Sequence, residues 1–137
     1  MKRRAFVLVN RAMNAVIGRI RPRRFRGADL LILTTTGRKT GTRRTTPLIY
    51  MPDGDRWIVV ASNGGGDWEP GWWLNLKAGS PAEIAIGDAV TPVRGAEITG
   101  AEREQMWTTL NENVFDFQGY QDQVSRTIAV VALTPVS

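Results

Sequence analysis

The sequence contains no cysteine and no histidine among its 137 residues. Disulfide bonds, thiol catalysis, serine–histidine triads and zinc sites built from Cys or His are therefore excluded. No acidic cluster resembles a calcium or magnesium loop, so no metal site is expected. An enzyme of this composition uses carboxylate, Lys, Tyr or Ser chemistry, or binds a cofactor that carries out the demanding step. The missing cysteines agree with a cytoplasmic location.

Long apolar runs are also missing. The longest in the first 24 residues, Ala5–Val9, is far too short for a membrane span or a signal-peptide core. Overall, 42% of residues are hydrophobic and 23% are charged, a composition typical of one globular domain. No repeat, low-complexity tract or interdomain linker is recognisable.

Acidic residues are scarce in the N-terminal third. Residues 1–44 hold 13 of the 18 basic residues and a single acid, whereas the remainder is net acidic. Such asymmetry indicates an anionic partner: nucleic acid, a membrane surface or an anionic cofactor.

The first 24 residues predict an amphipathic helix. Apolar residues from Phe6 to Ile20 recur every three or four positions, arginines fall mostly off that stripe, and Pro22 ends the helix. The helix either docks its stripe on the domain or lies on an anionic membrane, at the inner face of the cell membrane, through Met1–Arg24. We therefore divide the chain into a basic N-terminal helix, residues 1–26, and a barrel domain, residues 27–137.

A basic loop lies between two predicted strands, Leu30–Thr36 and Thr45–Met51. Gly37 and Gly41 allow positive φ angles, so that successive N–H groups can point into one concavity. Four cations and several hydroxyls surround the loop, and no acid lies between Asp29 and Asp53. This pattern is typical of a phosphate or carboxylate site, although a solvated basic hairpin has the same composition.

Six short strands and few helices predict an α+β fold that is mainly β. The first three strands are joined by turns too short for crossovers, which indicates an antiparallel barrel with peripheral helices. Further strands are predicted at Arg56–Ala61, Ala82–Ile86, Val90–Ile98 and Thr127–Leu133. Helices are predicted at Trp72–Lys77 and, from a Thr99-x-x-Glu102 capping box, through about Asn113, with an irregular stretch at Phe115–Val124.

Three ordered motifs, TTTGRKTGTRRTTPL, VVASNGGG and GWWLNLKA, resemble the deazaflavin-dependent nitroreductase family of actinobacteria. The resemblance runs from about Leu30 to the terminal SRTIAVVAL segment. It implies an antiparallel split β-barrel of the type that binds FMN or coenzyme F-420, an 8-hydroxy-5-deazaflavin with a phosphodiester and an oligoglutamate tail. It also implies a reductase that transfers a hydride from reduced F-420 to a planar conjugated acceptor such as a quinone, enone or nitroaromatic.

The resemblance also implies the residues of the cofactor site. Lys39 and Arg44 would bind the phosphate, and Pro47, which cannot donate to a strand ladder, would mark an interrupted pairing at a strand edge. The other residues of the predicted cofactor site are Arg38, Thr40, Gly41, Arg43, Thr46, Leu48, Ser62, Asn63, Gly64, Gly65, Gly71, Trp72, Trp73 and Asn75.

Two of these residues, Trp72 and Trp73, are adjacent and would point about 100° apart on a helix, so both cannot face one core stripe. Either one is core and the other caps a surface groove, or Trp72 packs near the deazaflavin as the family's equivalent position does.

Tyr120 is the predicted catalytic residue, because it matches a substrate-pocket tyrosine of the family and no His or Cys can donate a proton. Solvent is the alternative source of the proton, and ordinary aromatic packing of an exposed loop is the alternative role for Tyr120. Val114 and Phe117 stand where family members carry two further tyrosines, and Asn63 stands where a lysine is common. These differences remove two hydroxyl donors around the substrate and one cation near the ring, but leave the basic loop intact.

Two other functions remain open. An FMN-dependent reductase on the same barrel would need fewer cations, because FMN has no acidic tail. A nucleic-acid-binding barrel is disfavoured, because the cations cluster in one turn and one helix rather than alternating with aromatics along strands. If the N-terminal helix touches a membrane, a lipid-soluble quinone becomes the natural acceptor.

Overall fold

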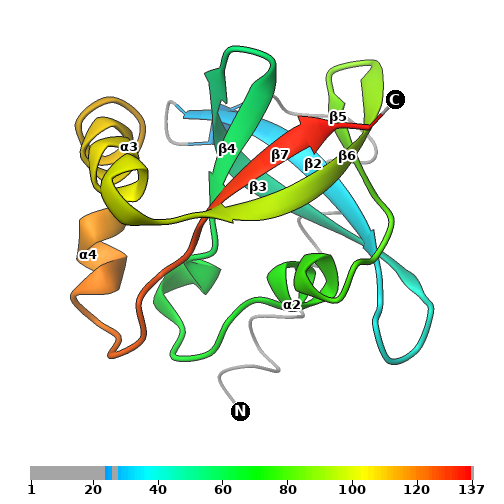
Figure 1. Ribbon diagram of the computed structural model, residues 1–137, viewed down its shortest axis with the longest axis horizontal. Coiled ribbons are helices and arrows are strands. Elements are labelled where there is room, and N and C mark those ends of the chain that lie inside the picture. Colours follow the sequence, from blue (N-terminus) through cyan, green and yellow to red (C-terminus); the bar gives the residue numbers. More distant parts are fainter. Residues whose placement is uncertain (1–23, 26–27, 137) are drawn as a thin grey trace.

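The structure, a computed structural model, describes residues 24–25 and 28–136, in which six strands close into an antiparallel barrel (Figure 1). The strands lie in the order β2-β3-β4-β7-β6-β5, and a pairing of β5 with β2 closes the barrel. A two-residue strand, β1 (Arg24–Phe25), pairs with β2. The barrel strands are β2 (Ala28–Thr36), β3 (Arg43–Asp53), β4 (Arg56–Val60), β5 (Ala82–Ile86), β6 (Ala89–Ile98) and β7 (Val130–Pro135). The predicted antiparallel barrel is confirmed.

Alternation along the strands sends side chains to two separate cores. On β4, Val59 belongs to an inner cluster, whereas Ile58 and Val60 belong to an outer one. Neighbouring residues of β7 divide in the same way, with Val131 inside and Val130 outside. The inner cluster is completed by residues of α2, and the outer cluster by residues of α3 and α4. These strands are therefore buried on both faces, as their nearly continuous apolar sequences require.

Helical segments occupy the two long connections. η1 (Asn63–Gly65) and α2 (Gly71–Lys77) join β4 to β5, and α3 (Gly100–Asn113) and α4 (Phe117–Gln121) join β6 to β7. Figure 1 shows α2 at one end of the barrel, and α3 and α4 to one side of it. Gly95 of β6 permits the close approach of α2, because a Cβ there would lie 2.8 Å from the Leu76 side chain. The predicted positions of the helical connections are confirmed.

The segment before the last strand differs from its prediction. The stretch predicted as irregular contains α4, whose N-cap, Asp116, accepts a hydrogen bond from the Gly119 N–H. The last strand begins at Val130 rather than Thr127. The reason is that the backbone N–H and C=O of Ile128 are bonded by side chains and are not available to a ladder.

The predicted capping box does not form. Helix α3 begins at Gly100, and its N-cap Thr99 makes no side-chain capping hydrogen bond. The Glu102 carboxylate instead pairs with Arg56 at 2.8 Å, which ties the first turn of α3 to β4. The predicted helix itself is confirmed, and its predicted end, Asn113, is its last residue. The predicted N-terminal helix within residues 1–26 falls largely outside the described residues.

Candidate functional site

The basic loop closes on itself through its own backbone groups. The Gly37 N–H donates to the Thr42 carbonyl and the Gly41 N–H to the Gly37 carbonyl, both at 2.8 Å. The N–H groups of Thr42 and Arg38 are also engaged, by the Thr40 hydroxyl and by Asn75. Four of the six N–H groups from Gly37 to Thr42 are therefore used within the protein, so the predicted concavity is not formed by all of the successive N–H groups. Gly41, at φ 71°, gives the turn its shape, and its N–H is not available to an anion.

The four cations predicted for the loop are not equivalent: Arg38 and Lys39 lie between β2 and β3, whereas Arg43 and Arg44 are the first two residues of β3 and pair with the end of β2. Arg43 pairs with Glu83 of β5, and the Arg38 guanidinium donates to the Asn75 side chain at 3.0 Å. Lys39 and Arg44 are exposed, and neither side chain makes an ion pair or hydrogen bond with the part of the chain that the structure describes. Their charges are therefore the ones most available to an anionic ligand.

An open cavity lies beside this loop. Its volume is about 180 Å³, and its walls come from the end of β2, from Arg38 and from the turn after α2. The residues that line it are Thr36, Gly37, Arg38, Ala78, Gly79, Ser80 and Pro81. If all four cations were paired with carboxylates of the protein itself, the loop could not bind an anionic ligand. Among the described residues, Arg43 is the one of the four that is paired in this way.

Buried Asn75 connects α2 to the basic loop. Its side-chain oxygen accepts from both the backbone N–H and the guanidinium of Arg38, and its Nδ2 donates to the buried Thr35 hydroxyl at 3.1 Å. Both lone pairs of Oδ1 are thus used within the protein, and one Nδ2 hydrogen remains. The described contacts therefore give Asn75 an anchoring role in addition to its predicted place in the cofactor site.

Replacing Asn75 with leucine is expected to lower the free energy of unfolding by about 2 kcal/mol, because the Thr35 hydroxyl and the Arg38 N–H lose their partner. Denaturant unfolding would measure this loss, and hydrogen exchange should show faster opening of residues 37–42. Asn113→Leu is the matched control, since Asn113 is exposed at the end of α3 and bonds only within its own helix. Equal stability of both variants would contradict the anchoring role.

One edge of β3 is unpaired beside the loop. β3 pairs with β2 from Arg43 to Ile49, but with β4 only from Tyr50 to Asp53. Among residues 24–25 and 28–136, no strand therefore pairs with the opposite edge of β3 along the predicted cofactor-binding residues Thr46, Pro47 and Leu48. The interruption inferred from the proline is confirmed on that edge, and the barrel is split there.

The two adjacent tryptophans of α2 are both buried. Trp72 is 7% and Trp73 is 3% exposed, and their ring centroids lie 6.4 Å apart. The prediction that both could not enter the core is wrong, because α2 sits at the end of the barrel and contacts both β2 and β6. Neither tryptophan caps a surface groove. A deazaflavin contact with Trp72 remains a prediction.

The glycine turn, Ser62–Gly66, is a tight non-repetitive segment. Asn63, Gly64 and Gly65 have φ angles of 52°, 59° and 86°, and the Asn63 side chain donates to the Trp68 carbonyl at 3.1 Å. At Gly65 a Cβ would lie 2.9 Å from Gln123 Oε1 and 3.2 Å from the Tyr120 ring. The absence of a side chain there lets the α4 region lie directly on the turn.

A larger cavity, of about 380 Å³, lies at α4. It is lined by Phe115, Asp116, Gly119, Tyr120 and Gln123. Phe117 is 4% exposed and Val114 packs on the outer core, and neither lines the cavity. Of the three positions where the family carries tyrosines, Tyr120 is thus the one that reaches this space.

Apart from Gly71, Trp72 and Trp73, which form the start of α2, the predicted site residues fall into two groups. The basic loop, the β3 edge and Asn75 form one, and the glycine turn with Tyr120 forms the other. The two cavities share no lining residue. In Figure 1 the β2–β3 loop and α4 lie on opposite sides of α2.

Three functional candidates, Gln121, Gln123 and Arg126, contact the glycine turn or hold the segment that does, and the sequence did not predict them. The sequence signal for this region is that Arg126 is the second residue of the SRTIAVVAL motif. Within the described part of the chain, no group of three Asp, Glu, His or Cys side chains is placed to bind a metal ion. No helix there is long and apolar enough to cross a membrane.

The chain is similar in sequence and in fold to known proteins. A family model described as F420H(2)-dependent quinone reductase matches residues 2–135. The F420H(2)-dependent quinone reductase Rv1261c of Mycobacterium tuberculosis is 41% identical over 107 residues, which cover 76% of this chain and 72% of that relative. A solved structure described as an F420-H2 dependent reductase, FDR-A, matches with a TM-score of 0.67 at 33% identity, covering 76% of this chain and 92% of the other. HutZ of Vibrio cholerae, with a TM-score of 0.58 over 79% of this chain and 82% of its own, is 11% identical and shows the fold alone.

Proposed function

The chain belongs to the F420H(2)-dependent quinone reductase family, and on that premise we propose that it reduces a planar quinone-type acceptor in the cavity beside Tyr120, while the basic loop holds the acidic end of the cofactor. The predicted cofactor and reductase class are confirmed by the family. The residue roles and the acceptor are the proposal.

The observation that carries this proposal is the availability of Lys39 and Arg44. Lys39 follows Arg38, which lines the open cavity, and Arg44 lies on β3 just before its unpaired edge. A phosphodiester and a glutamate tail need side-chain cations, and a flat ring system needs an apolar slot with backbone groups at its rim. The donor set of this chain therefore fits F-420. The glycine turn would meet the ring from the other side through its backbone at Gly64, because Tyr120 and Gln123 fill the space beside Gly65.

When bound, reduced F-420 supplies a hydride. The chain contributes binding, orientation and the exclusion of water, and reduction of a quinone to a hydroquinone needs one further proton. The Tyr120 hydroxyl is the donor that we assign to an acceptor oxygen, because it is the hydroxyl on the cavity wall, whereas the Asp116 carboxylate there accepts a hydrogen bond from the Gly119 N–H.

Fluorescence titration of the protein with F-420 and with FMN tests the cofactor assignment, and an anaerobic assay with F-420H2 and a naphthoquinone tests the acceptor. We expect tighter binding of F-420 and quinone-dependent oxidation of its reduced form. Tighter binding of FMN, or oxidation only by nitroaromatic compounds, would overturn the proposal.

Tyr120→Phe is expected to lower kcat for the quinone by about tenfold to a hundredfold and to leave F-420 affinity unchanged, because the phenyl ring keeps the shape of the cavity. Phe115→Leu, also on the cavity wall but without a donor, serves as the control and should act mainly on KM. An unchanged kcat in Tyr120→Phe would show that solvent supplies the proton.

We further propose a cytoplasmic enzyme that meets lipid-soluble quinones at the membrane surface through Met1–Arg24. The support is the basic, apolar-striped sequence of that segment. Flotation with anionic liposomes, with and without residues 1–24, tests it. Equal soluble fractions would defeat the membrane contact while leaving the reductase assignment intact.

A further inference from the structure

Arg126 is a charged residue at the glycine turn that neither binds the phosphate end of the cofactor nor donates the proton. The Arg126 guanidinium lies on carbonyl oxygens of the turn: its Nη2 donates to both Ser62 and Gly66 at 3.2 Å, and its Nε approaches Gly66 at 3.4 Å. The two carbonyls stand at the two ends of the turn. The guanidinium makes these three contacts through two nitrogens held in one plane, which the single nitrogen of a Lys ammonium cannot reproduce.

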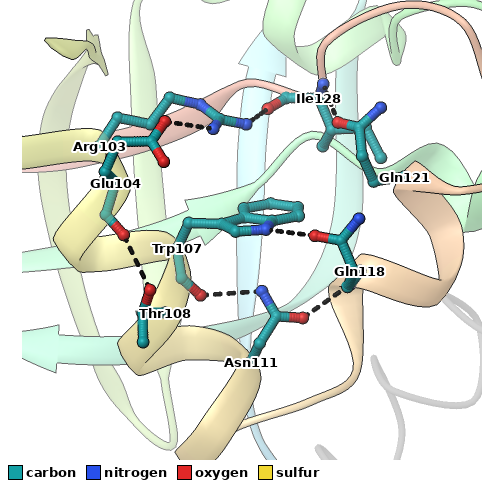
Figure 2. Close-up of polar contacts among 8 residues, drawn as sticks. All are labelled: Arg103, Glu104, Trp107, Thr108, Asn111, Gln118, Gln121 and Ile128. Carbon is teal, nitrogen blue, oxygen red and sulfur yellow. Dashed lines mark hydrogen bonds and ion pairs between the residues drawn. The ribbon is translucent and has the colours of Figure 1, made fainter. Parts of the chain in front are cut away.

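The position of Arg126 is fixed in turn by Gln121, the last residue of α4. Gln121 Nε2 donates to the Arg126 carbonyl at 2.7 Å, and its Oε1 accepts from the Ile128 N–H at 2.9 Å. Figure 2 shows Gln121 turned toward Ile128, whose carbonyl accepts from Arg103 of α3 at 2.7 Å. The segment that carries Arg126 is thus held at both sides by side chains of α3 and α4.

Helix α4 is itself held by α3. Trp107 Nε1 donates to Gln118 Oε1 at 2.7 Å, and the Gln118 N–H donates to Asn111 Oδ1 at 2.6 Å (Figure 2). The cavity at Tyr120 and the glycine turn therefore rest on one cross-linked unit. Tyr120 and Gln123 also contact the turn directly at Gly65.

Holding Arg126 in this place has an energetic cost. Burial lowers its pKa from the usual arginine value, opposed by the charges of Glu69 and Asp67. Its Nη1 is buried and has no hydrogen-bond partner among residues 24–25 and 28–136. Desolvation of a cation is offset here by carbonyl contacts to the turn, so the turn and Arg126 stabilise one another.

We propose that Arg126 is a positioning residue that couples α4, on the acceptor side, to the glycine turn on the cofactor side. It acts on the ring end of the cofactor site and not on the phosphate end. This inference rests on the proposed function, because it assigns the turn to the ring of F-420.

The test compares two ligands: F-420 and its tail-less head, the deazaflavin riboside without phosphate and glutamates. Arg126→Met is expected to weaken both by about the same factor, roughly tenfold, since the loss lies at the ring. Arg126→Lys should bind both ligands almost as weakly as Arg126→Met. Gln121→Leu should show part of the same loss of affinity, although Gln121 does not contact the turn. The effects of Arg126→Met and Gln121→Leu should be less than additive in the double variant, because they act through one contact.

Arg94→Met is the matched control, since Arg94 is exposed on β6 and lies away from both cavities; it should change neither affinity. If the wild-type protein binds neither ligand, the proposed function fails. If the wild-type protein binds both ligands, and the Arg126→Met and Gln121→Leu variants bind them equally tightly, the coupling role is wrong while the proposed function stands. A loss confined to full-length F-420 would place Arg126 at the phosphate end and also overturn the inference.

Discussion

Replacing Lys39 and Arg44 together with alanine is expected to weaken binding of F-420 by at least about a hundredfold. Each side chain would contribute about 1.5–3 kcal/mol as a charge-assisted contact to a phosphate or carboxylate oxygen. Both are exposed, so some of that energy is lost to water and salt. Fluorescence titration at low and high salt measures the loss directly, and the wild-type affinity should fall as salt rises.

Arg43→Ala is the matched control for this double variant, because it removes a cation from the same loop that is already paired with Glu83. Its effect on F-420 affinity should be several-fold smaller than that of either Lys39→Ala or Arg44→Ala. The tail-less head offers a second control, since its affinity should not respond to any of the three changes. Equal losses of F-420 affinity in all three single variants would indicate that the net positive charge of the loop attracts the cofactor, and that Lys39 and Arg44 are not specific ligands.

The strands were predictable because their signal is local. Alternating and β-branched runs fix β4, β5 and β6 to within a residue or so at their ends, and short turns fix their antiparallel pairing. The basic loop was found from composition alone, since two glycines and four cations are contiguous in the chain. What composition did not determine is where the donors of the loop point.

The errors arose where tertiary contacts outweigh local preference. Asn75 engages the N–H of Arg38, so this N–H is not available to the predicted concavity. The pair Trp72 and Trp73 is buried because α2 is enclosed at the barrel end, which no periodicity within seven residues can indicate. Helix α4 spans only five residues, too few for a helical period to be visible.

The position of the Arg126 side chain at the functional site could not be predicted from the local sequence either. Its partners, Ser62 and Gly66, are 64 and 60 residues away in the chain. A lone arginine in a polar stretch predicts a solvated side chain, and the acceptors here are backbone carbonyls, which carry no residue-type signal at all. Only the fold brings the residues before β7 against the turn after β4, since the two strands pair side by side.

Substitution of Gly65 by alanine should damage turnover far more than it damages folding. Gly65 has φ 86°, where an alanine costs about 1–2 kcal/mol. The added Cβ would lie 2.9 Å from Gln123 Oε1, the end of an exposed and flexible side chain that can move at little cost. It would also lie 3.2 Å from the Tyr120 ring, which packs against Phe115 and has less freedom to move.

The expected result for Gly65→Ala is a modest loss of stability and a fall of about tenfold to a hundredfold in kcat/KM for the quinone, because Tyr120 is displaced from the acceptor. Gly54→Ala separates the two effects: it has φ 63°, and no atom lies within 4 Å of the added Cβ. It should lose similar stability and keep its activity. Adding Gln123→Ala to Gly65→Ala should not restore kcat/KM, because the Tyr120 contact persists. Full recovery in that double variant would mean that Gln123, and not Tyr120, transmits the change at the turn to the acceptor cavity.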